Sequence, residues 1–139
     1  MTWLVWALLS ALFAAATAIF AKLGVAGVDS NFATAIRTSV VVVLAWAIAL
    51  ATSSAGSFHV PSKRTWLFLT LSGLATGISW LCYFRALQLG PASRVAPIDK
   101  LSVALVIGFA ALFLGETMTW GKALGGLLIV AGAIVVALD

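Results

Sequence analysis

Four charged side chains stand inside segments that are otherwise apolar, and they are the residues best placed to do chemistry. Arg37, Arg85, Asp99 and Lys100 each lie about one to two helical turns inside a long hydrophobic run. A charge at the centre of a membrane helix costs roughly 2.5–3.5 kcal/mol, and a carboxylate among cations in a low dielectric should pair. We therefore expect Asp99 to pair with Arg37, Arg85 or Lys100, either as a structural ion pair or as part of a ligand site.

Aromatic residues with polar atoms form a stripe in the same region. Trp80 and Tyr83 follow Gly73 and Thr76 at i, i+3, i+4 spacing, so one helix face carries all four. The small residues leave room beside the rings. This pattern is typical either of a wall that contacts an organic ligand or of ordinary aromatic packing.

The composition defines the class of protein. Of the 139 residues, 63% are hydrophobic and only 9% are charged, whereas soluble domains carry about 25% charged residues. The chain is therefore an integral membrane protein, and its first partner is the lipid bilayer. Its net charge of +4 comes from scattered basic residues that form no phosphate-binding stripe, so we expect no nucleic-acid partner. The single cysteine, Cys82, lies in an apolar segment and cannot form a disulfide within the chain.

Hydropathy predicts an all-α membrane protein with five spans in one domain, residues 1–139. A spanning helix needs about 20 mostly apolar residues, and five segments qualify, at about 3–22, 31–52, 65–89, 94–114 and 121–138. The first lacks the basic start and short apolar core of a signal peptide. A polar stretch at 53–64 separates the second and third segments.

Connectivity assigns the charged residues to one side of the bilayer. The turn between spans one and two and the turn between spans three and four must share a membrane face. Arg37 lies near the start of span two, Arg85 near the end of span three, and Asp99 and Lys100 near the start of span four, so all four should lie toward that face. Asp99 and Lys100 are adjacent and point about 100° apart on a regular helix, so they should not both face one point.

Pro97 predicts a break in the helix beside these charges. With Ser93 as the expected N-cap, Pro97 ends the first turn, and its missing N–H leaves the Ser93 carbonyl without a helical donor. Such a carbonyl is tolerated in a membrane only where protein groups or water satisfy it. We expect Pro97 to mark the mouth of a water-accessible path.

Small residues predict close helix contacts. Gly73 and Gly77 in span three, and Gly121 and Gly125 in span five, have the spacing at which membrane helices approach closely. The alternatives are packing within one bundle, which the pattern favours, and a dimer face.

Residues 83–135 resemble the EamA-type domain of the drug/metabolite transporter superfamily. The resemblance is carried by "AL..GPAS.VAPI" across spans three and four, "LGE" at 114–116, and the closing "LGGLLIVAGAIV". Most members of that family resemble two five-span halves fused in inverted orientation, with the substrate path between them. By this resemblance the chain is expected to be one half, working as an antiparallel homodimer or with an inverted sister half.

The distribution of basic residues suits insertion in both orientations. With the N-terminus inside, three basic residues flank the inner side and two the outer side; including Arg37, Arg85 and Lys100 changes this to three against five. Orientation follows such Lys and Arg asymmetry. A near balance therefore favours an antiparallel homodimer.

We expect a cell-membrane transporter, and an exporter in direction, of small metabolites or drugs that works by alternating access without metal, cofactor or catalytic residues. Substrates with a carboxylate or phosphate fit the basic residues. The alternative is a non-transporting membrane subunit that stabilises a partner. An enzyme is disfavoured because His59 stands alone in a loop, without a paired acid or nucleophile. The expected substrate path comprises Arg37, Trp80, Tyr83, Asp99, Lys100 and Ser102.

Overall fold

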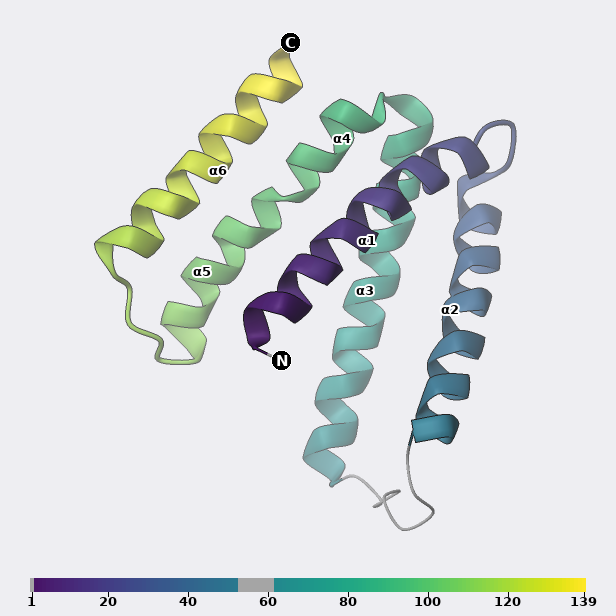
Figure 1. Ribbon diagram of the computed structural model, residues 1–139, viewed down its shortest axis with the longest axis horizontal. Helices are drawn as coiled ribbons and strands as arrows, with labels where there is room; N and C mark the ends of the chain where they lie inside the picture. Colours follow the sequence, from purple (N-terminus) through teal and green to yellow (C-terminus); the bar gives the residue numbers. More distant parts are fainter. Residues whose placement is uncertain (1, 53–61) are drawn as a thin grey trace. The chain divides into compact units, whose positions relative to one another are not determined.

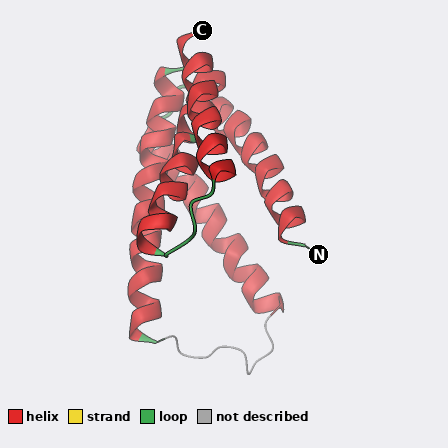
Figure 2. Ribbon diagram, turned by 90° about the vertical axis from the view of Figure 1, so that its left-hand side faces the viewer, coloured by secondary structure: helices red, strands yellow, loops and turns green. Residues whose placement is uncertain are grey.

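The computed structural model describes residues 2–52 and 62–139, and every regular element in these ranges is a helix (Figures 1 and 2). The polar stretch expected at 53–64 lies largely outside the described residues, and so does His59. In chain order, the helices are α1 (Trp3–Gly24), α2 (Ser30–Thr52), α3 (Lys63–Leu89), α4 (Ala92–Asp99), α5 (Leu101–Phe113) and α6 (Trp120–Leu138).

The five predicted spans are confirmed. α1, α2, α3 and α6 are each long and apolar enough to cross a membrane, and α4 with α5 forms a further span from Ala92 to Phe113. Large apolar side chains cover the helix surfaces; Trp120, for example, is 91% exposed and Phe113 is 80% exposed. Such surfaces belong against lipid, because a soluble protein rarely exposes large contiguous apolar patches.

The chain divides into two compact units. The first unit consists of residues 1–23 and 89–139, and holds most of α1 together with α4, α5 and α6. The second unit consists of residues 24–88 and holds α2 and α3.

In the second unit, α2 and α3 run antiparallel (Figure 1), and both helix starts are capped by side chains. One carboxylate oxygen of Asp29 accepts hydrogen bonds from the amides of Asn31 and Phe32, each at 3.0 Å. The hydroxyl of Ser62 accepts a bond from the Thr65 amide at 3.1 Å. Such caps satisfy amides that the first helical turn leaves without partners.

Polar residues within α2 find acceptors on their own helix. The hydroxyls of Thr34 and Thr38 donate to the carbonyls four residues earlier, each at 2.7 Å, and that of Ser39 does the same at 3.1 Å. Because lipid supplies no hydrogen-bond partners, this internal pairing makes the hydroxyls tolerable in a span.

In the first unit, the start of α4 differs from the prediction. The expected N-cap at Ser93 is wrong, because α4 begins at Ala92 and its N-cap is Pro91. Pro91 has extended backbone angles, and its carbonyl accepts hydrogen bonds from the amides of Arg94 and Val95, each at 3.1 Å. The turn before α4 is joined to the end of α1 by a 2.9 Å hydrogen bond from Lys22 Nζ to the Gly90 carbonyl.

The fourth span is interrupted at Lys100, three residues after Pro97. The Lys100 amide is shared between the carbonyls of Ala96 (3.3 Å) and Pro97 (3.1 Å), and the Val103 amide reaches back only three residues, to Lys100, at 3.0 Å. Bonds to the third residue back tighten a helix locally. Pro97 lacks the N–H that would bond to the Ser93 carbonyl in the turn before the interruption, and α5 restarts one residue beyond α4.

α5 and α6 form a hairpin (Figure 1) through a turn that contains Gly115, whose φ of 69° suits glycine. Both the Leu114 and Glu116 amides donate to the Ala110 carbonyl, at 3.0 and 3.2 Å. Thr119 then caps α6 by accepting a bond from the Lys122 amide. The turn therefore fixes Glu116 and Lys122 beside the end of α5.

Glycine allows close packing between α5 and α6 at Gly126. A Cβ added there would lie 3.5 Å from Cδ1 of Ile107. Gly73, Gly77 and Gly125, three of the predicted packing glycines, have no such neighbour within 4 Å, and at Gly121 the nearest atom is the Thr119 hydroxyl, 3.9 Å away.

Candidate functional site

The second unit brings Arg37 of α2 against an aromatic residue of α3. The guanidinium carbon of Arg37 lies over the Trp80 ring, 4.0 Å from its centroid, and 5.6 Å from the centroid of the Phe84 ring. Phe84 is buried, while Arg37 and Trp80 are half-buried. A cation at this distance from a ring face gains about 0.5–2 kcal/mol, more as water is excluded.

Tyr83 belongs to the same group. It is half-buried, and it is close enough to Arg37 for an electrostatic interaction between the two side chains. Three of the six predicted path residues, Arg37, Trp80 and Tyr83, are thus gathered within one unit. We call Arg37, Trp80, Tyr83 and Phe84 the arginine–aromatic cluster.

In the part of the second unit that the structure describes, no ion pair joins Arg37 to a carboxylate. Within that unit the contacts of Arg37 are with aromatic rings. In the first unit, Asp99 pairs with Lys100 and Glu116 pairs with Lys122. The cation–π gain of about 0.5–2 kcal/mol is smaller than the roughly 2.5–3.5 kcal/mol cost of a buried arginine. A guanidinium that lies over a ring still has N–H groups with which to bind an anion.

Arg85 lies in a different environment from Arg37. Its Nη1 donates to the Gln88 side-chain oxygen at 2.9 Å, and the Gln88 amide donates to the Val28 carbonyl. This chain of hydrogen bonds ties the end of α3 to the loop before α2. Arg85 is exposed, and its bond to Gln88 supports the side chain that makes the link to Val28.

In the first unit, Asp99 pairs with Lys100, one of its three predicted partners. Lys100 Nζ lies 3.2 Å from Asp99 Oδ2, and the two side chains are 55% and 37% exposed. The pair forms although regular helix geometry separates neighbours by about 100°, and it lies where the helix is interrupted at Lys100. The hydroxyl of Ser102 donates to the Asp99 carbonyl at 2.8 Å and so spans the break. Pro97 lies before the break and Ser102 lies after it.

The structure thus places the predicted path residues in two groups, one in each unit. Sequence reasoning missed Phe84, although its position four residues after Trp80 puts it on the same helix face. It also missed Gln88 and Gly126, whose roles depend on tertiary contacts.

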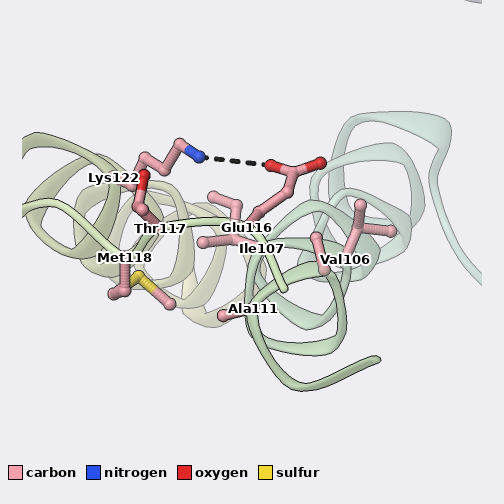
Figure 3. A pocket seen from close by; sticks show the side chains of 8 residues that line it. Val106, Ile107, Ala111, Glu116, Thr117, Met118 and Lys122 are labelled. Atoms are coloured by element: carbon pink, nitrogen blue, oxygen red, sulfur yellow. Dashed lines mark hydrogen bonds and ion pairs between the residues drawn. The ribbon is translucent and has the colours of Figure 1, made fainter. Parts of the chain in front are cut away.

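A cavity of about 150 Å³ lies between α5, α6 and the turn that joins them (Figure 3). Its wall is mostly apolar, and an ion pair between Lys122 Nζ and Glu116 Oε2, 3.2 Å apart, lies at its rim. Glu116 is the last residue of the "LGE" motif at 114–116. The lining residues are Val106, Ile107, Ala110, Ala111, Glu116, Thr117, Met118 and Lys122.

The fold and the charged groups define a multi-pass, all-α membrane protein with polar sites in otherwise apolar spans. The chain belongs to the EamA-like transporter family, which it matches over residues 1–138. It is therefore a membrane transporter by family, as the resemblance in its second half predicts.

Relatives agree with this assignment. An "uncharacterized transporter in cobO 3'region" from Sinorhizobium sp. is 57% identical over 98% of this chain and 96% of its own length. A "probable 4-amino-4-deoxy-L-arabinose-phosphoundecaprenol flippase subunit ArnF" from Erwinia tasmaniensis is 40% identical over 60% of this chain and 65% of its own length. The uncharacterized protein MJ1333.1 of Methanocaldococcus jannaschii is 28% identical over 58% of each chain. No solved structure matches the chain.

Proposed function

We propose that the chain is a secondary transporter that exports small metabolites or drugs, working as an antiparallel homodimer by alternating access. Five spans place the two ends of the chain on opposite sides of the membrane, so a single copy cannot supply both orientations of an inverted repeat. Two copies inserted in opposite directions supply both. In this proposal residues 1–139 act as one transport domain without cofactor, metal or catalytic chemistry.

The observation that carries the proposal is the position of Arg37 over Trp80 and near Phe84, where no carboxylate of the described part of the second unit pairs with it. An arginine in this state binds carboxylates and phosphates well, because its planar N–H groups match their oxygen atoms. We assign Arg37 as the anchor for an anionic group, with Trp80 and Tyr83 contacting the organic part of the substrate.

Asp99, Lys100 and Ser102 act, in this proposal, as a gate beside the helix break. A discontinuous membrane helix exposes backbone groups and gives a point at which two helical segments can change their angle. The Asp99–Lys100 pair is partly exposed and forms between neighbouring residues, so little free energy is needed to rearrange it.

The proposal is tested by flux into liposomes that contain only the purified protein. The probes are benzoate, glucose 6-phosphate and the cation tetraphenylphosphonium. We expect the two anions to be carried and Arg37→Gln to slow their flux at least about tenfold, because one charge-assisted hydrogen-bond partner is lost. Arg37→Lys should keep part of the flux.

The matched control is Arg85→Gln. It removes an arginine from α3 that is exposed and bonded to Gln88, and it should leave anion flux within about twofold, since a twofold change corresponds to less than about 0.5 kcal/mol. Transport of tetraphenylphosphonium alone, or equal losses in the Arg37 and Arg85 variants, would contradict the assignment of Arg37.

A second candidate function is that of a non-transporting subunit. One relative is named as a flippase subunit, which favours a role beside a partner chain. The name of that relative refers to a phosphate-linked lipid, and Arg37 could bind the phosphate of such a lipid. Flux by the purified chain alone excludes this candidate, whereas flux that appears only with a co-expressed membrane partner supports it.

A further inference from the structure

The cavity between α5 and α6 has a feature that the proposed transport path does not use. Its wall is built from Val106, Ile107, Ala110 and Ala111 of α5, which are apolar, and its rim carries Glu116 and Lys122 (Figure 3). The cavity therefore combines an apolar interior with one negative and one positive group at its opening.

The positions of Glu116 and Lys122 in the chain indicate how deep the rim of the cavity lies in the bilayer. Glu116 lies in the turn after α5, and Lys122 lies in the first turn of α6. Charged residues at the ends of spans lie in the interfacial layer, where lipid headgroups lie. The side chains of Lys122 and Glu116 are 42% and 55% exposed, so both can be reached by a headgroup.

We propose that this cavity binds one aminophospholipid with a primary ammonium group, such as phosphatidylethanolamine. The lipid phosphate accepts hydrogen bonds from Lys122, the ammonium donates to Glu116, and the carbons next to the headgroup contact Val106 and Ala110. The two rim charges exchange their mutual ion pair for two charge-assisted hydrogen bonds to the lipid.

Charge complementarity selects this lipid over others. The phosphate of an anionic lipid at Lys122 would lie close to the Glu116 carboxylate. Such a lipid has no cation of its own to compensate the charge of that carboxylate. A phosphatidylcholine headgroup has a cation but no N–H to donate. In phosphatidylethanolamine the phosphate satisfies Lys122 and the primary ammonium satisfies Glu116, and specificity arises from the penalties on the alternatives.

The size of the cavity fits part of a lipid. Cavities of about 150 Å³ hold a molecule of roughly six heavy atoms, such as benzene, and this cavity has that volume. It therefore holds the segment next to the headgroup, while the acyl chains extend into the bilayer along the apolar surface of α5.

The test compares lipid retention by the purified protein. The protein in detergent is mixed with phosphatidylethanolamine, phosphatidylcholine or phosphatidylglycerol of identical acyl chains, and bound lipid is counted by native mass spectrometry. We expect phosphatidylethanolamine to be retained about tenfold more than the other two and to raise the midpoint of thermal unfolding by several degrees.

Variants assign the effect to the cavity. Glu116→Gln should abolish the preference for phosphatidylethanolamine over phosphatidylglycerol, and Lys122→Gln should lower retention of all three lipids. The double variant Glu116→Lys with Lys122→Glu keeps both charges and should keep the preference, so it tests the proposal even if a single variant folds poorly. The control Lys63→Gln removes an exposed cation at the start of α3 and should change nothing.

Equal retention of the three lipids by the unmodified protein would overturn the proposal, as would equal losses in Lys63→Gln and Lys122→Gln. This readout does not involve flux, so the lipid site stands or fails independently of the transport function.

Discussion

The guanidinium of Arg37 lies over the indole of Trp80, 4.0 Å from the ring centroid, and this contact joins the two helices of the second unit. The centroid of the buried Phe84 ring lies 5.6 Å from the same guanidinium carbon. The aromatic rings lower the cost of keeping a cation within a span while leaving its hydrogen-bond donors available. Under the proposed function, stability and ligand binding depend on the same side chain.

A double-mutant cycle on Arg37 and Trp80 should give a coupling free energy of about 0.5–2 kcal/mol, the range of a cation–π contact. The variants are Arg37→Gln, Trp80→Leu and their combination, and the free energy of unfolding is measured in mixed micelles. Trp80→Phe should retain part of the coupling, because the ring remains. Additive effects of the two single changes would show that the contact does not stabilise the protein.

Changes at the Asp99–Lys100 pair should affect transport more than stability. The pair is partly exposed, and such pairs contribute about 0–1 kcal/mol, so Asp99→Asn and Lys100→Ala should each change the free energy of unfolding by less than about 1 kcal/mol. If the pair acts as the gate, both variants should lose most anion flux or change its pH dependence. The gate assignment is wrong if both leave flux and its pH profile intact.

Pro97→Ala should make the fourth span more continuous. We expect the new N–H to donate to the Ser93 carbonyl and the interruption at Lys100, three residues later, to weaken. We expect slower amide hydrogen exchange over residues 98–103 and slower flux. Ala96→Gly, which leaves the proline in place, serves as a control for local substitution. Unchanged exchange in Pro97→Ala would mean that other contacts impose the break.

Most of the fold follows from the sequence because membrane insertion imposes a simple rule. Each spanning helix needs a run of apolar residues long enough to cross the bilayer. This requirement predicts all five spans, with ends within about two residues of those observed. The start of α4 was misplaced because Ser93 is a favoured capping residue, whereas the carbonyl of Pro91 performs this role without a side-chain bond.

The candidate site was predicted only in part, because its contacts join different helices. The contact between Arg37 and Trp80 could be suspected from residue type, but its geometry depends on how α2 meets α3. The ion pair of Asp99 with Lys100 depends on the helix break, which lies three residues beyond Pro97. The Glu116–Lys122 cavity depends on the turn at Gly115, and no pattern of spacing predicts it.

Enlarging Gly126 should destabilise the α5–α6 hairpin. A Cβ at this position already meets Ile107 at 3.5 Å, so Gly126→Ala should be tolerated, while Gly126→Leu should cost about 1–3 kcal/mol through overpacking. Gly132→Leu on the same helix is the control, since nothing lies within 4 Å of a Cβ there. The free energy of unfolding in micelles measures both, and equal costs would contradict the assigned packing.

The antiparallel homodimer is the central claim of the proposed function, and the orientation of the inserted chain tests it most directly. Cysteines introduced at Ser54 and Ser57, in a Cys82→Ser background, are labelled in intact cells with a reagent that cannot cross the membrane, and again after the membrane is opened. Both positions lie between spans two and three. The proposal predicts that each is labelled from both sides in comparable amounts, because the nearly balanced basic residues allow insertion in both orientations. Labelling from one side only would contradict the homodimer, and the chain would then require an inverted partner of different sequence.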